Sequence, residues 1–113
     1  MTFDEYQRLA LRTAGHREDT QQVLTYTALG LTGESGEVAE VIKKAFFHAH
    51  PLDKEALSKE LGDVLWYLAV MADGLGIGLE QIAQSNIEKL RKRYPDGFSE
   101  ERSLNRNDQV GQF

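Results

Sequence analysis

The chain of 113 residues contains no cysteine, only two prolines and a single tryptophan, and its net charge is −5. Without cysteine there are no disulfides, no thiolate metal site and no cysteine nucleophile. The negative charge argues against non-specific binding of nucleic acid. No apolar run approaches the roughly 20 residues of a membrane span, and no signal peptide is apparent. We therefore expect a cytoplasmic protein without nucleic-acid or membrane partners.

The composition is that of an ordinary folded domain, with 41% hydrophobic and 27% charged residues. The chain is long enough for one modest core. Apolar residues recur at helical spacing, and no segment alternates apolar and polar residues long enough to indicate a strand. We therefore expect an all-α protein, with a four-helix domain over residues 1–95 and a polar tail over residues 96–113.

Helix boundaries follow from capping residues and helix breakers. Thr2 fits an N-cap of the first helix, and a polar link follows over residues 15–22. The second helix is predicted from about residue 23 to residue 47, and the fourth from about residue 79 to residue 94. Pro51 and Asp53 separate the second helix from the third. The predicted core stripe of the second helix is Leu24, Ala28, Leu31, Val38, Ile42 and Phe46. That of the third helix is Leu57, Leu61, Val64, Leu65, Leu68, Ala72 and Leu75.

The second and third helices each contain two carboxylates three residues apart, Glu34 with Glu37 and Glu60 with Asp63. Residues at this spacing share one face of a helix. In an antiparallel hairpin the two pairs can face each other, so that four carboxylates converge on one small volume. Like charges repel there, and each desolvated charge costs several kcal/mol. A hard divalent cation removes this cost, and magnesium, manganese and calcium all prefer oxygen ligands.

Small residues and candidate substrate ligands accompany these pairs. Gly30, Gly33 and Gly36 lower helix propensity but permit close approach by a ligand or another helix. Positive charges beside a metal site suit phosphate groups. The candidate substrate ligands are Lys44 in line with Glu37, Tyr67 in line with Glu60 and Asp63, and Asn86, Lys89 and Arg93 together on one face of the fourth helix.

Three segments resemble the MazG-type nucleotide pyrophosphohydrolases of the all-α NTP pyrophosphatase superfamily: GLTGESGEVAEVIKK, KELGDVLWYL and NIEKLRKRYPDGFS. The resemblance spans residues 24–99. It implies Mg²⁺-dependent hydrolysis of a nucleoside triphosphate to the monophosphate and pyrophosphate, as in nucleotide-pool house-cleaning, with Mn²⁺ as a substitute ion. The site roles that it implies are metal ligation by Glu34, Glu37, Glu60 and Asp63, and substrate contacts from Tyr67, Asn86, Lys89 and Arg93.

The general base stays open between Glu34 and Glu37. Many relatives have a doubled glutamate whose first member can serve as base, whereas this chain has Gly33 at that position. Two other functions are compatible with the same residues. One is a related enzyme that resembles phosphoribosyl-ATP pyrophosphohydrolase, and the other is a non-catalytic helical adaptor whose acidic stripe is only solvated surface.

The third helix has a further apolar side, formed by Gly62, Trp66, Ala69 and Val70. A surface helix needs only one apolar stripe, and four short helices offer little to cover a second one. We therefore expect Trp66 to pack against a second subunit, in a homodimer or homotetramer whose hairpins form a bundle. The family resemblance also implies a bundle completed by oligomerisation.

Overall fold

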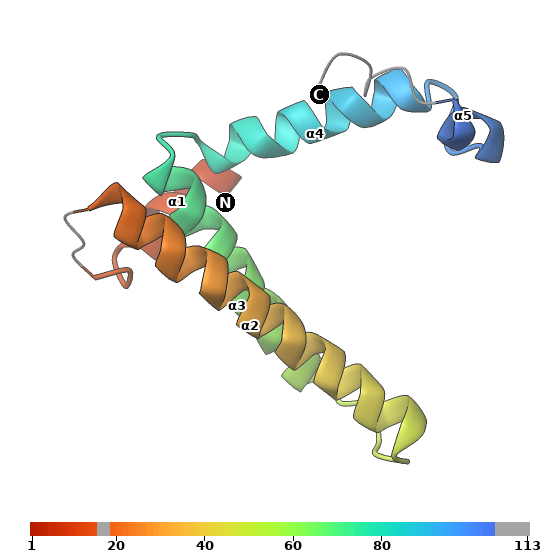
Figure 1. Cartoon of the computed structure of the whole chain (residues 1–113), viewed down its shortest axis with the longest axis horizontal. Helices are drawn as coiled ribbons and strands as arrows, with labels where there is room; N and C mark the ends of the chain where they lie inside the picture. The colour runs from red at the N-terminus through yellow and green to blue at the C-terminus, as the bar shows by residue number, and fades with distance from the viewer. Residues whose placement is uncertain (16–18, 106–113) are drawn as a thin grey trace. The chain divides into compact units, whose positions relative to one another are not determined.

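The computed structural model describes residues 1–15 and 19–105, and within these ranges it contains helices and no strand (Figure 1). The expectation of an all-α fold is confirmed. The chain divides into two compact units, Met1–Leu79 and Glu80–Phe113. The helices are α1 (Phe3–Leu11), α2 (Thr20–Phe47), α3 (Lys54–Gly74), α4 (Leu79–Arg93) and α5 (Glu100–Leu104).

Side-chain caps fix the starts of the first three helices. Thr2 Oγ1 accepts a hydrogen bond from the Glu5 backbone N–H at 3.0 Å, as the sequence predicts. Asp53 Oδ1 accepts from the N–H of Ala56 at 3.0 Å and starts α3. Asp19 does the same for α2, so this helix begins at Thr20 and takes in the end of the predicted polar link.

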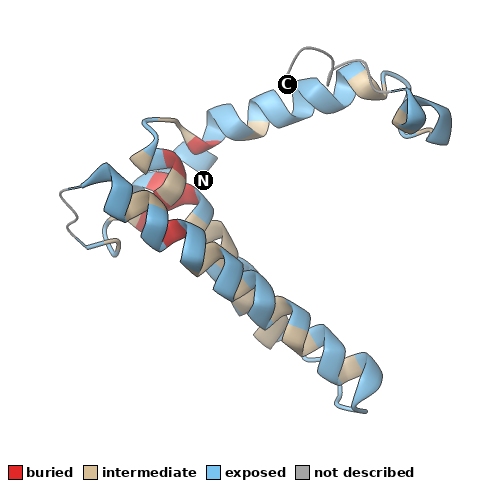
Figure 2. Cartoon of the chain, viewed as in Figure 1, coloured by how far each residue is buried: buried red, intermediate tan, exposed pale blue. Residues whose placement is uncertain are grey.

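α2 and α3 form an antiparallel hairpin, and α1 packs on α3 (Figure 1). The buried residues Ala10, Ala69 and Leu79 gather where α1 meets α3 (Figure 2). Gln7 is buried among them, and both its amide nitrogen and its amide oxygen form hydrogen bonds. Its N–H groups donate to the carbonyls of Ala69 and Ile77, both at 3.1 Å. Its Oε1 accepts from the N–H of Leu79 at 3.0 Å. Since an unsatisfied buried amide is costly, this network ties α1 to α3 and to the segment that follows it.

The predicted core stripes are only partly correct. On α2, Thr27 is fully buried, and its hydroxyl donates to the carbonyl of Val23 at 2.7 Å. Phe46, assigned to the core, is 69% exposed, and Leu61, Leu68 and Leu75 of α3 are 53%, 41% and 54% exposed. A hairpin of two helices buries only the narrow seam between them, so the outer parts of both stripes stay on the surface.

The Trp66 side of α3 is the side that α1 covers. The indole N–H of Trp66 donates to the carbonyl of Ala10 at 3.2 Å and to Thr13 Oγ1 at 2.9 Å, and Ala69 and Val70 are buried. The expectation that a single chain leaves this side bare is therefore wrong, because α1 supplies the covering surface. Packing of Trp66 against a second subunit stays a prediction.

The second unit contains most of α4 and the short helix α5, which lies within the predicted polar tail. Ser99 Oγ accepts from the N–H of Arg102 at 3.0 Å and caps α5, and the rings of Tyr94 and Phe98 pack with centroids 5.3 Å apart. The last part of the tail lies outside the described residues. Among the helices that the structure describes, none is by itself long and apolar enough to cross a membrane; only α3 and α4 taken together, with a bend between them, meet that test of length and composition.

Candidate metal centre

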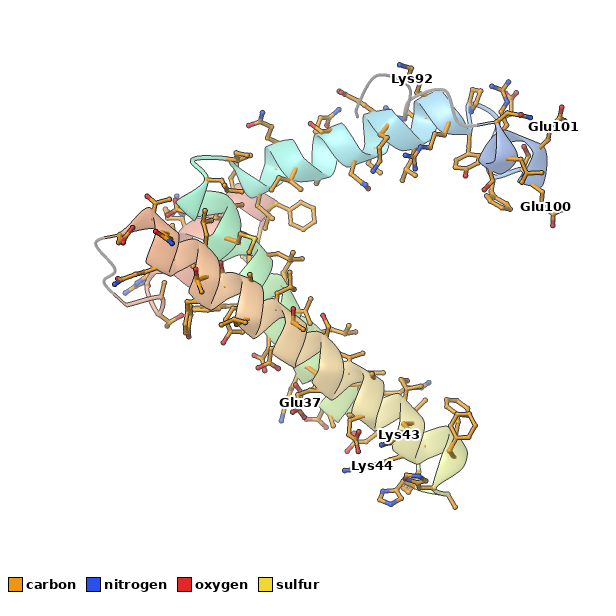
Figure 3. All side chains as sticks on the ribbon, viewed as in Figure 1. Glu37, Lys43, Lys44, Lys92, Glu100 and Glu101 are labelled. Atoms are coloured by element: carbon orange, nitrogen blue, oxygen red, sulfur yellow. The ribbon has the colours of Figure 1, made fainter. Side chains whose placement is uncertain are left out.

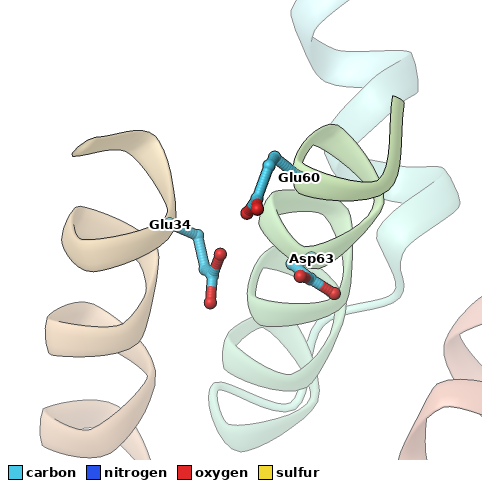
Figure 4. Close-up of side chains that lie close together, drawn as sticks. All are labelled: Glu34, Glu60 and Asp63. Carbon is cyan, nitrogen blue, oxygen red and sulfur yellow. The ribbon is translucent and has the colours of Figure 1, made fainter. Parts of the chain in front are cut away.

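Three of the four predicted carboxylates meet across the α2–α3 hairpin. Figure 4 shows Glu34 of α2 facing Glu60 and Asp63 of α3, with one carboxylate oxygen from each residue within 4.8 Å of the others. Glu34 and Glu60 are half-buried, and Asp63 is exposed. The cluster therefore lies at the edge of the helix seam, where a ligand can reach it from solvent.

The close approach of the two helices explains how short carboxylate side chains can meet. At Gly74 a Cβ atom would lie 2.9 Å from Cγ1 of Val23, so α3 presses its backbone against α2 there. Gly30 of α2 is in similar contact with α3 through the ring of Tyr67. Glycine permits such contacts because it has no side chain. The predicted role of Gly30 in close helix approach is confirmed, whereas a Cβ at Gly33 or Gly36 would meet nothing within 4 Å.

Two glutamates of α2, Glu34 and Glu40, have pKa values shifted in opposite directions. Desolvation, a hydrogen bond with Glu60 and the charge of Asp63 together raise the pKa of Glu34. Two turns later, Glu40 pairs with Lys43 at 3.1 Å and with Lys44 at 3.9 Å, and the hydrogen bond and charge of Lys43 lower the pKa of Glu40. One carboxylate is thus neutralised by the protein, while the other is surrounded by like charges.

This cluster fits a hard divalent cation. Across residues 1–15 and 19–105, no lysine or arginine forms an ion pair with Glu34, Glu60 or Asp63. The carboxylates of α2 and α3 therefore face one another without a cationic side chain between them in the described residues. A divalent cation would offset this negative charge with two positive charges, and oxygen donors of this kind suit magnesium or manganese.

Glu37 lies next to the cluster rather than in it, and Lys44 lies about two turns further along α2. Glu37 is exposed one turn beyond Glu34 on α2, and its charge is among those that raise the pKa of Glu34. Figure 3 shows Glu37 and Lys44 on the same side of α2, as the sequence predicts. The ammonium group of Lys44 lies 3.9 Å from Glu40, and both side chains are about half exposed, so this pair contributes little to stability.

Two tyrosines border the carboxylates. Tyr67 follows Asp63 by one turn of α3. Its pKa is raised mainly by a hydrogen bond with Tyr26 and by desolvation, and the charges of Glu34 and Asp63 raise it further. Tyr6 of α1 is the second: burial and then the charge of Asp63 raise its pKa. Tyr6 could not be connected with this cluster from the sequence, because no spacing rule relates a residue of α1 to a carboxylate of α3.

Asn86, Lys89 and Arg93 are all part of α4, where their spacing places them on one face. They belong to the second unit, whereas the carboxylates belong to the first. Their predicted contact with the phosphates of a substrate therefore stays a prediction. His48 and His50 follow α2 and are not in the carboxylate group, and His16 lies outside the described residues.

The family of the chain follows from comparison with known proteins. The profile of the MazG nucleotide pyrophosphohydrolase domain matches residues 21–98, so the chain belongs to this family of all-α proteins. The "Gene 37 protein" of Mycobacterium phage L5 is 35% identical over 105 residues, which cover 86% of this chain and 92% of that protein.

Two further relatives extend the comparison. The "dCTP pyrophosphatase 1" of Mus musculus is 33% identical over 101 residues, which cover 83% of this chain and 59% of the mouse protein. The "Uncharacterized protein YvdC" of Bacillus subtilis (strain 168) is 33% identical over 73 residues, which cover 57% of this chain and 69% of that protein. No solved structure gives a significant match.

Proposed function

We propose that the protein is a Mg²⁺-dependent nucleoside triphosphate pyrophosphohydrolase, which converts a (deoxy)nucleoside triphosphate and water to the monophosphate and pyrophosphate. The observation that supports this proposal most is the cluster of Glu34, Glu60 and Asp63, which lacks any cationic partner in the described residues. Membership of the MazG family and the likeness to a dCTP pyrophosphatase support the reaction class.

The residues of the chain divide between the cation and the substrate. Glu34, Glu60 and Asp63 would hold a divalent cation, and Glu37, one turn further on α2, completes the set of four acidic ligands. When bound, such a cation supplies the charge that lowers the pKa of a coordinated water and neutralises phosphate oxygens. The substrate contacts that we propose are Lys44, Tyr67, Asn86, Lys89 and Arg93.

Glu34 and Glu37 remain the two candidates for the general base. Glu34 is one of the three clustered carboxylates, so as a base it would act on a water molecule at the same cluster. Glu37 is exposed and outside the three-residue cluster, which leaves its oxygens accessible to a water molecule. The affinity for Mn²⁺ separates the two roles when Glu34 and Glu37 are each replaced by Gln. A substitution that removes only the base should lower kcat and leave the affinity for Mn²⁺ unchanged. A substitution that removes a metal ligand should lower both kcat and the affinity for Mn²⁺.

A product assay tests the proposal. Purified protein is incubated with Mg²⁺ and separately with dATP, dCTP, dGTP, dTTP and phosphoribosyl-ATP, and the phosphorus products are followed by ³¹P NMR. We expect pyrophosphate and a nucleoside monophosphate from at least one of the deoxynucleotides, and water labelled with ¹⁸O then shows which phosphorus is attacked. Release of orthophosphate would contradict a pyrophosphohydrolase. Turnover of phosphoribosyl-ATP alone would favour the related enzyme. The absence of both turnover and a Mg²⁺-dependent thermal shift would favour a non-catalytic adaptor.

We also propose that the protein acts in the cytoplasm as a homodimer or homotetramer. The exposed leucines Leu61, Leu68 and Leu75 support association, because residues seven apart form the seam by which one helix packs on another. They provide an apolar surface on α3 in addition to the predicted Trp66 side, which α1 partly covers.

A further inference from the structure

The ring of Tyr67 is held by neighbours on α2 and α3. It packs edge-on against Trp66, with centroids 5.0 Å apart and planes at 87°, and lies tilted against Tyr26 with centroids 5.8 Å apart. A hydrogen bond joins the hydroxyls of Tyr26 and Tyr67. Trp66 is itself fixed on α1, because its indole N–H donates to the carbonyl of Ala10 and to Thr13. The ring of Tyr67 therefore has little freedom to turn.

The backbone of α2 at Gly30 forms the remaining wall around this ring. A Cβ atom at Gly30 would lie 2.6 Å from Cδ1 of Tyr67 and closer still to Cε1 and Cζ. No side chain fits into that space, so the present position of the ring requires glycine. A Cβ at Gly36, in the same helix, would meet nothing within 4 Å. Among the neighbours that a Cβ would meet, the two glycines thus differ by the contact with Tyr67.

The position of the Tyr67 ring matters because of its neighbours on this side of the hairpin. Tyr67 follows Asp63 by one turn of α3, which places its ring next to the carboxylate cluster, and the charges of Glu34 and Asp63 contribute to the raised pKa of its hydroxyl. A nucleotide whose phosphates are held at the carboxylates has its sugar and base beyond them, and an aromatic ring offers these groups a flat apolar contact. Tyr26, which packs on this ring, also lines an open hollow of about 530 Å³ together with Asp19, Gln21, Gln22 and Thr25.

We propose that Gly30 and Tyr26 are positioning residues, which fix the ring of Tyr67 beside the carboxylate cluster and thereby set the affinity for the nucleoside part of the substrate. This inference rests on the proposed function. Gly30 acts by leaving space for the ring, and Tyr26 acts by holding its hydroxyl. Neither residue takes part in the chemical step, so their effect falls on KM rather than on kcat.

Gly30→Ala tests the inference, with Gly36→Ala as the matched control. Both changes raise the helix propensity of α2 equally, but only the first displaces the ring of Tyr67. We expect Gly30→Ala to raise KM for dCTP about tenfold with kcat changed less than about twofold, and Gly36→Ala to change neither. Near-UV circular dichroism checks the displacement, because the chain has one tryptophan and Tyr67 packs on its ring.

Tyr26→Phe removes the hydroxyl but keeps the ring. We expect KM to rise about fivefold, the size of one hydrogen bond, with the fold and the Mn²⁺ affinity unchanged. This variant decides the inference even where Gly30→Ala fails to fold. An unchanged KM in Tyr26→Phe would overturn the role of Tyr26.

A double-mutant cycle separates positioning from general destabilisation. In a Tyr67→Ala background there is no ring to displace, so Gly30→Ala should have no further effect on KM. Additive effects, or a Gly30→Ala variant that behaves like Gly36→Ala in KM and in its spectrum, would overturn the inference. If the wild type releases no pyrophosphate, the proposed function is wrong, but the positioning role can still be tested. The same double-mutant cycle is then measured with dissociation constants for dCTP and dATP, obtained by isothermal titration calorimetry in the presence of Mg²⁺. Absence of nucleotide binding as well would overturn both.

Discussion

The two sides of the α2–α3 hairpin present opposite chemical surfaces. One side has Glu34, Glu60 and Asp63 close together, and the other has Leu61 and Leu68 of the same helix α3 exposed to solvent. The carboxylates repel one another, and the leucines expose apolar area that water disfavours. This difference is the physical basis of two separate proposals, a bound cation on the first side and association through the second.

The largest expected effect comes from removing charge on the carboxylate side. Asp63→Asn and Glu37→Gln should each lower turnover of the preferred nucleoside triphosphate at least about a hundredfold at saturating Mg²⁺, since each removes an acidic ligand. The apo form of Asp63→Asn should be as stable as the wild type or more so, because one like charge leaves the cluster. Pyrophosphate release and thermal melting without Mg²⁺ measure the two effects.

Glu40→Gln is the matched control for these variants. It removes a carboxylate from the same helix as Glu37, but this carboxylate is paired with Lys43 and Lys44 at the surface. Turnover should stay within about twofold of the wild type, as exposed pairs contribute little. Near wild-type turnover in Asp63→Asn, or an equal loss in all three variants, would show that the carboxylate cluster is not the site.

The cations of α4 provide a sharper comparison within one helix. Lys89→Ala and Arg93→Ala should each lower kcat/KM by about 10–100-fold, the size of a lost hydrogen bond to a charged group. Arg91→Ala, on another face of α4, should lower it less than about threefold. Steady-state kinetics with the same nucleotide compare the three variants, and equal losses would mean that general basicity, not one face of the helix, binds phosphate.

The smallest expected change in stability concerns the apolar side. Leu68→Glu should shift the protein towards monomers in sedimentation velocity, while the free energy of unfolding of the subunit changes by less than about 1 kcal/mol, because Leu68 is 41% exposed.

Trp66→Glu should instead lower the free energy of unfolding by about 2–4 kcal/mol, since it removes packing and a hydrogen bond with α1. A wild type that sediments as a monomer at micromolar concentration with full turnover would refute the need for association.

Local features of the sequence were sufficient to predict the four longer helices and the spacing of the candidate ligands along them. Thr2 and Asp53 cap helices where predicted, because capping depends on a few consecutive residues. The spacing of Glu60 and Asp63 places both on one face of α3 whatever surrounds the helix. The MazG family could be recognised from short segments alone, and the profile match confirms it.

Only the tertiary structure decided which helix faces meet. Helical spacing predicted Phe46 in the core and did not single out Thr27, whereas the folded chain buries Thr27 and leaves Phe46 exposed. The register between α2 and α3 brought Glu34 into the carboxylate cluster and left Glu37 outside it. Periodicity fixes positions within one helix, whereas the rotation and offset of two helices depend on contacts between residues far apart in the sequence, such as Gly30 with Tyr67.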